Sequence, residues 1–170
     1  MATEQSTVHE AQIETDARLR NGSLLMALAG LGFVGYGIVF LVRALTGTGF
    51  ELGVATLDGV TRVELAATYP EVAYYITHAH VALAGFILTT GIAITALAWY
   101  GVRSGQLWAW ATAVTAAVLG LVIALPMHYT GGFAHDWVTH LGPIYLAAVV
   151  FVIGAVLALL SIRASTLSVE

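Results

Sequence analysis

Four long apolar stretches, separated by short polar segments, divide the chain. A helix needs about 20 apolar residues to cross the hydrocarbon core of a bilayer. Stretches of this kind run from Ser23 to Ala44, from Tyr74 to Tyr100, from Leu107 to Met127 and from Trp137 to Ile162. The pattern predicts an all-α integral membrane four-helix bundle over residues 23–163, with a polar arm at 1–22 and a C-terminal tail at 164–170.

The polar segments predict how the spans are joined. Residues 45–71 have mixed polarity and predict an ordered external loop, with a short interfacial helix across Val60 to Thr68. The next connection, Gly101 to Gln106, is short enough only for a tight turn between antiparallel helices. The third connection, His128 to Asp136, contains two glycines and predicts another loop.

Composition supports a membrane protein and narrows its chemistry. Apolar residues make up 59% of the chain and charged residues 9%, against about 45–50% and about 25% in soluble domains. The absence of cysteine excludes disulfides, thiolate metal sites, iron–sulfur clusters and c-type haem attachment. No basic patch for nucleic acid is present, and membrane lipid is the expected partner.

Arginine positions predict the orientation in the membrane. Four arginines fall on the side of the termini and two on the opposite side: Arg18, Arg20, Arg103 and Arg163 against Arg43 and Arg62. Positive charge in short loops favours the cytoplasmic side. The sequence therefore predicts a multi-pass protein of the cell membrane with both termini in the cytoplasm.

Five of the six histidines fall at one level of the predicted bundle, near its outer face. They come from three segments of the chain: His78, His80, His128, His135 and His140. Ionisable residues inside a span are costly and are usually functional. The alternative is that these imidazoles only anchor the helices at the interface, by bonding to headgroups, water or backbone carbonyls.

His78 and His80 are two residues apart on one predicted helix. Such residues lie about 200° apart around the helix axis, so their imidazoles point to opposite sides. They cannot easily chelate one ion together, but each can ligate a different centre.

Two prolines predict breaks beside the remaining histidines. Pro126 is expected to end or bend the third helix just before His128. Pro143, preceded by Gly142, is expected to kink the start of the fourth helix, which could turn His140 inward.

The run Thr77–His78–Ala79–His80 and the small residues after it, up to Gly85, resemble the His-x-His helix of the haem-copper oxidase superfamily. The resemblance is closest to the nitric oxide reductase branch. In that family the first histidine ligates the high-spin haem and the second the low-spin haem. The resemblance therefore implies haem b bound by His80 and, less directly, by His78.

The topology adds to this resemblance. The family's large subunit consists of three pseudo-repeats of four helices, with haem ligands on the second helix of a repeat. The chain is similar to one such repeat standing alone, and a homotrimer would rebuild the twelve-helix architecture.

Three functions remain open from the sequence. The first is a b-type haem protein in electron transfer, or associated with a respiratory complex. The second is a zinc or copper module in which His128, His135, Asp136 and His140, with His78 or His80, supply nitrogen and oxygen ligands. The third is a structural membrane subunit without a cofactor. Catalysis by the chain alone is not favoured, because no serine–histidine–acid spacing and no phosphate-binding loop is present.

Overall fold

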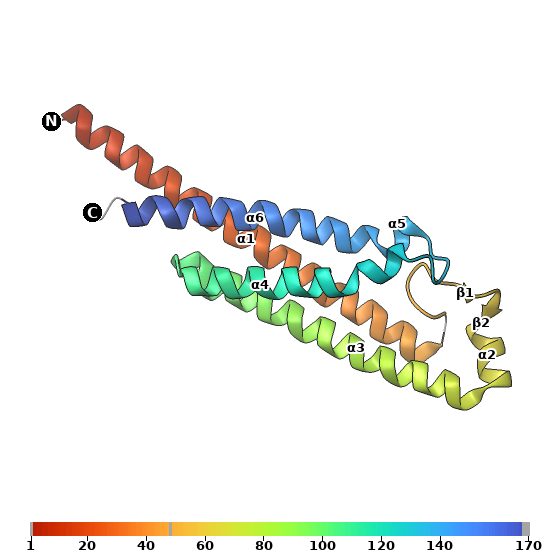
Figure 1. Cartoon of the computed structure of the whole chain (residues 1–170). Coiled ribbons are helices and arrows are strands. Elements are labelled where there is room, and N and C mark those ends of the chain that lie inside the picture. Colours follow the sequence, from red (N-terminus) through yellow and green to blue (C-terminus); the bar gives the residue numbers. More distant parts are fainter. Residues whose placement is uncertain (1, 48, 168–170) are drawn as a thin grey trace.

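The computed structural model describes residues 2–47 and 49–167, with side chains for 16–47, 49–165 and 167. It is an all-α bundle of four long helices, with one small hairpin at one end (Figure 1). The long helices are α1 (Ala2–Thr46), α3 (Pro70–Ala96), α4 (Leu107–Ala124) and α6 (Gly142–Leu167). The shorter elements are β1 (Thr56–Leu57), β2 (Val60–Thr61), α2 (Arg62–Thr68), a π-helical turn η1 (Leu97–Gly101), the 3-10 turns η2 (Val102–Ser104) and η3 (Pro126–Tyr129), and α5 (Trp137–His140).

Four of the helical stretches are long and apolar enough to cross a membrane. They are Asp16–Thr46, Pro70–Ser104, Leu107–Tyr129 and Gly142–Ser165. The multi-pass membrane architecture predicted from the hydrophobic pattern is therefore confirmed. α1 begins and α6 ends at the same end of the bundle, called here the terminal end, and the opposite end is called the loop end (Figure 1).

α1 is the central helix and packs against both α3 and α6. Glycines make both contacts close. A Cβ built on Gly91 of α3 would lie 2.7 Å from the carbonyl oxygen of Gly30 in α1, and one built on Gly154 of α6 would lie 2.7 Å from that of Gly22. Small residues let helix backbones approach closely in a membrane, where dispersion contacts replace the hydrophobic effect as the source of packing energy.

The apolar core lies toward the terminal end. Its fully buried residues are small or unbranched for the most part: Met26, Ala98, Val102, Ala109, Ala113 and Ala158. α4 joins this core through its first two turns, and the Trp110 indole N–H donates to the carbonyl oxygen of Ala155 in α6 at 2.9 Å. The half of α4 nearer the loop end is largely exposed.

Both prolines interrupt helices as the sequence predicts. α4 ends at Ala124, and Pro126 begins the 3-10 turn that carries His128. The fourth predicted span is divided, because α5 ends at His140 and α6 begins at Gly142. Pro143 suits the first turn of α6, where its missing N–H has no intrahelical partner to lose.

The connection from α1 to α3 contains the predicted short helix, which is α2, and a hairpin that was not predicted. Asp58 and Gly59 both have positive φ, +49° and +79°, between two antiparallel residue pairs. This is the pattern of a type I′ turn, for which Asp-Gly is a preferred sequence. At the start of α2, Thr61 and Glu64 form a reciprocal capping box, and these hydrogen bonds hold the pKa of Glu64 below its ordinary value.

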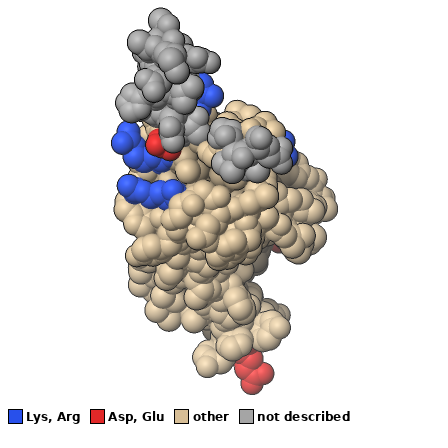
Figure 2. Space-filling model, turned by 90° about the vertical axis from the view of Figure 1, so that its left-hand side faces the viewer, with Lys and Arg blue, Asp and Glu red and all other residues tan. Residues whose placement is uncertain are grey.

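Charge is distributed unevenly between the two ends. Viewed from the terminal end, arginine side chains lie around the helix ends, while most of the visible surface is uncharged (Figure 2). By their elements these arginines are Arg18 and Arg20 of α1, Arg103 of η2 and Arg163 of α6. Arg43 and Arg62 lie at the loop end, on the side predicted from the sequence.

Candidate functional site

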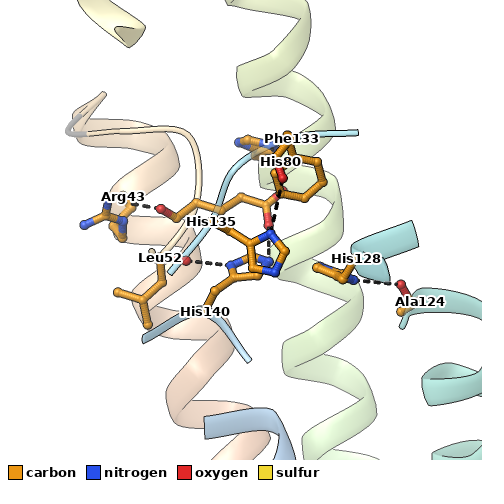
Figure 3. Close-up of polar contacts among 9 residues, drawn as sticks. Arg43, Leu52, His80, Ala124, His128, Phe133, His135 and His140 are labelled. Carbon is orange, nitrogen blue, oxygen red and sulfur yellow. Dashed lines mark hydrogen bonds and ion pairs between the residues drawn. The ribbon is translucent and has the colours of Figure 1, made fainter. Parts of the chain in front are cut away.

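The loop end brings four histidines together from separate segments (Figure 3). His80 lies on α3, His128 on η3, His135 in the link that follows, and His140 at the end of α5. The ring centres of His128 and His140 are 4.9 Å apart, those of His135 and His140 5.1 Å, and those of His128 and His135 5.7 Å. The convergence predicted from the sequence therefore holds for these four side chains.

A tight turn at residues 50–54 inserts Glu51 between the histidines. The Glu51 carboxylate lies 3.6 Å from His80 Nε2 through Oε1 and 3.8 Å from His140 Nε2 through Oε2. Sequence reasoning did not include Glu51 in the site, because a 27-residue connection gives no register for its side chains. The only signal was its position between two apolar residues, Phe50 and Leu52, which are the kind that anchor a turn.

Several contacts hold that turn in place. The His140 Nδ1–H donates to the carbonyl oxygen of Leu52 at 2.6 Å, and the Asp136 N–H donates to that of Gly53 at 2.9 Å. Arg43 Nη2 donates to the Glu51 carbonyl oxygen at 3.2 Å. Gly53 has φ +77°, and a Cβ there would lie 2.9 Å from the backbone nitrogen of His140. Only glycine suits both the conformation and the close approach.

Backbone carbonyls orient three of the imidazoles. The Nδ1 atoms of His140, His128 and His135 face the carbonyl oxygens of Leu52, Ala124 and Phe133 at 2.6, 3.1 and 3.4 Å. A ring nitrogen that faces a carbonyl must carry the proton, so Nε2 of a neutral ring keeps its lone pair. Metal-ligating histidines show this arrangement, with the non-ligating N–H donated to a carbonyl or carboxylate.

Unpaired buried polar atoms concentrate at the same end. Among the described residues, buried side-chain nitrogens without a hydrogen-bond partner are Arg43 Nε, Arg62 Nη1, His80 Nδ1, His135 Nε2 and His140 Nε2. Buried polar atoms in native proteins are rarely left unpaired. An atom that lacks a protein partner usually binds a ligand, an ion or water. His140 is 1% exposed, so its Nε2, 3.8 Å from Glu51 Oε2, faces the interior of the cluster rather than solvent.

His78 is the predicted site residue that lies outside the cluster. It is exposed on α3, whereas His80 is half-buried, with its ring centre 5.2 Å from that of Phe40 in α1. The two imidazoles thus lie on different sides of the helix, as their spacing predicts.

Asp136 has a structural role at the start of α5. Its carboxylate accepts hydrogen bonds from the backbone N–H and the hydroxyl of Thr139, at 2.8 and 2.7 Å. The bond from the Thr139 backbone is the largest cause of the lowering of the Asp136 pKa below its ordinary value. This N-cap fixes the turn of helix that carries His140.

The cluster is not arranged to hold an ion without movement. Among the described residues, no group of three or more His, Asp or Glu side chains has the geometry of a metal site as it stands. A metal would require the rings to turn about their side-chain torsions. Two imidazoles bound to one tetrahedral ion at about 2.0–2.1 Å have ring centres about 5.2 Å apart, within the range found here.

Comparisons with family models, with curated proteins and with solved structures found no match to this chain.

Proposed function

We propose that the chain is an integral membrane protein that binds a transition-metal ion, zinc or copper, at its loop end. The ligands are Nε2 of His128, His135 and His140, with a carboxylate oxygen of Glu51. One observation carries this proposal: three imidazoles lie 4.9–5.7 Å apart, and each turns its Nδ1 toward a backbone carbonyl. A purely structural role for the histidines gives no reason for Nε2 of His135 to be buried without a hydrogen-bond partner.

Charge at the loop end favours a cation. The acidic residues of this region outnumber the basic ones, five against two: Glu51, Asp58, Glu64, Glu71 and Asp136 against Arg43 and Arg62. A net negative surface raises the local concentration of cations and speeds their capture. Imidazole and carboxylate donors suit Zn²⁺ and Cu²⁺.

Haem b is the second candidate, and it stays a prediction. His78 supports it, because this imidazole heads an exposed face of small residues on α3 (Ala82, Gly85 and Thr89), against which a flat macrocycle or a second helix can lie. His80 supports it less. Its Nε2 faces Glu51 and its ring contacts Phe40, so a macrocycle on this nitrogen would have to displace both side chains.

Orientation and assembly are part of the same proposal. We propose that the terminal end is cytoplasmic, in keeping with the four arginines located there. The exposed small-residue face of α3 supports a homo-oligomer, with a trimer as the arrangement implied by the four-helix repeat. In that setting the metal centre would face the outside of the cell membrane, where a respiratory-chain partner is one source of electrons for a copper ion.

The test is a Co²⁺ titration of the detergent-purified, tag-free protein. Tetrahedral Co²⁺ absorbs in the visible, so binding at the cluster should produce bands that Zn²⁺ abolishes by competition. His128→Ala should weaken binding by more than about 100-fold, the upper range for loss of a supporting contact. His78→Ala, which removes an imidazole outside the cluster, should leave the titration unchanged.

The same sample separates the candidates. Absence of Co²⁺ bands from folded protein would contradict the metal proposal. A Soret band with sharp reduced α and β bands, lost in His78→Ala or His80→Ala, would establish haem instead. His128→Ala is preferred to His140→Ala as the main variant because His128 is not part of the buried contact with Leu52.

A further inference from the structure

A groove at the loop end is lined by residues other than the clustered histidines. It lies among the β1–β2 hairpin, α2 and the first turns of α3, which are neighbours in Figure 1. Its volume is about 870 Å³. Pockets that bury small organic molecules in proteins have volumes of about 300–1,000 Å³. The groove is therefore large enough for a ligand of its own.

Most of the lining of the groove is apolar. Phe50 is buried there, Leu57, Leu65 and Ile76 are half-buried, and Val72 is exposed at the opening. Removing apolar surface from water is favourable. This lining therefore suits a ligand with an apolar body.

Two carboxylates also line the groove, those of Asp58 and Glu64. Within the described part of the chain, the Asp58 carboxylate has no hydrogen bond and no ion pair. Glu64 accepts the backbone N–H and the hydroxyl of Thr61 through Oε2, at 2.8 and 2.7 Å. These bonds lower the pKa of Glu64, so its carboxylate is ionised at neutral pH and keeps Oε1 for another partner.

No basic side chain neutralises this pair of carboxylates. The described residues that line the groove include no arginine. Arg62 precedes Glu64 by two residues, but it is 7% exposed and its guanidinium donates to the Ala73 carbonyl oxygen and the Thr77 hydroxyl of α3. The groove therefore combines apolar walls with uncompensated negative charge.

We propose that this groove binds a small hydrophobic ammonium compound, with its cation beside Asp58 and Glu64 and its apolar body against Leu65 and Ile76. Ligand pockets are typically of this kind, mostly apolar with a few polar groups that fix the orientation of the ligand. A zwitterionic lipid headgroup suits the groove less well, because its phosphate would face the same two carboxylates and like charges repel. The inference is independent of the proposed metal site.

The experiment measures binding of phenylpropyl-trimethylammonium by equilibrium dialysis. The full-length protein is held in nanodiscs of zwitterionic lipid, with EDTA present so that no metal takes part, and empty nanodiscs correct for partitioning into lipid. We expect saturable binding that weakens as salt is added. The neutral analogue, in which carbon replaces the nitrogen, should compete only weakly.

Matched variants locate the site. Asp58→Asn keeps a preferred type I′ turn sequence, Asn-Gly, and should weaken binding by up to about 5-fold, as for an exposed ion pair. Glu71→Gln removes the same charge from a residue that does not line the groove, and should bind as the unaltered chain does. Val72→Trp should fill the groove and remove saturable binding, whereas Val63→Trp, on an exposed residue of α2 outside the groove, should not.

Three results would overturn the proposal. The first is binding to the unaltered chain that does not exceed binding to empty nanodiscs. The second is equal affinity for the cation and its neutral analogue, or an affinity that Val72→Trp leaves unchanged. The third is displacement of the probe by dihexanoyl-phosphatidylcholine at lower concentration than by unlabelled probe, which would assign the groove to a lipid headgroup.

Discussion

The two ends of the bundle differ in how completely their buried polar atoms are paired. At the terminal end, glycines and alanines bring backbones into contact and bury the core residues from Met26 to Ala158. Among the described residues there, every buried side-chain polar atom has a hydrogen-bond partner. At the loop end, polar side chains from four segments meet, and all five buried unpaired nitrogens found in the described part of the chain lie there.

The two ends therefore have different physical requirements. A contact between membrane helices needs close packing, and small residues supply it without a bound ligand. Each buried nitrogen left unpaired at the loop end costs about 1–3 kcal/mol until a ligand, an ion or water pairs with it. The terminal end therefore supplies the scaffold, and the loop end carries the proposed binding site.

Breaking the scaffold should have the largest effect. Gly91→Leu places a side chain against the backbone of Gly30 and Val34, with the first carbon 2.7–2.8 Å from their atoms. We expect loss of the folded monomer, since overpacking that cannot relax costs about 1–3 kcal/mol or more. Gly120→Leu on α4 is the control, because a Cβ at Gly120 has nothing within 4 Å, and this variant should fold. Size-exclusion chromatography and thermal unfolding followed by circular dichroism would show the contrast, and equal behaviour of the two variants would contradict it.

Displacing the turn that carries Glu51 should have the next largest effect, confined to the loop end. Gly53 has a positive φ, and a Cβ there also clashes with His140, whereas Gly59 has a similar φ, +79°, and open space around it. Gly53→Ala and Gly59→Ala should both lose about 1–2 kcal/mol from backbone strain. Only Gly53→Ala should also weaken Co²⁺ binding, by about 10–100-fold. Equal affinities of the two variants would show that the turn does not position the site.

Removing one hydrogen bond between α4 and α6 should have a smaller effect. Trp110→Phe removes the indole donor to the Ala155 carbonyl, and we expect a loss of about 0.6–1.7 kcal/mol, as for other polar contacts between membrane helices. Trp108→Phe removes an exposed contact with Gln106, the residue that precedes α4, and serves as the control. Chemical denaturation in mixed micelles would measure both. A larger loss in Trp108→Phe would mean that α4 is held by its exposed face instead.

The smallest effects should come from two helix caps at the loop end. The folded-state pKa values of Asp136 and Glu64 are lowered. Each carboxylate therefore stabilises the fold above its unfolded pKa, which is about 3.9 for Asp and about 4.3 for Glu. That contribution is lost as the pH falls through the lowered folded-state pKa. Asp136→Asn and Glu64→Gln should both slightly reduce thermal stability at pH 7, and the differences should shrink as the pH approaches 3. Only Asp136→Asn should also weaken Co²⁺ binding, because α5 carries His140. A loss of Co²⁺ affinity in Glu64→Gln of the same size would contradict this.

Much of the scaffold follows from the sequence. Apolar runs of 20 or more residues predict membrane helices. A proline in a helix interior kinks or breaks the helix, so the breaks near Pro126 and Pro143 were predictable. The sequence did not predict which glycines make helix contacts. Gly35 and Gly37 are two residues apart on α1, yet only Gly37 meets a neighbouring helix, because contact depends on the rotation of each helix about its axis.

The site was predictable only in part. Imidazoles at helix ends share a level in the bilayer, so the convergence of His80, His128 and His140 could be read from topology. Glu51 could not, because its position depends on the Leu52 and Gly53 contacts with α5, nearly 90 residues away in the chain. Asp58–Gly59 was a readable hairpin signal that the mixed polarity of its surroundings obscured.

Hydrogen–deuterium exchange with and without Zn²⁺ tests the difference between the two ends most directly. The unaltered chain in detergent should show slower exchange in peptides covering 45–71 and 125–141 when Zn²⁺ is added, with no change in peptides from the terminal half of α1, α3 and α6. His78→Ala should respond in the same way, and His128→Ala should not respond. Exchange that is insensitive to Zn²⁺ at the loop end, or altered equally at both ends, would contradict the assignment of the loop end as a metal-binding site.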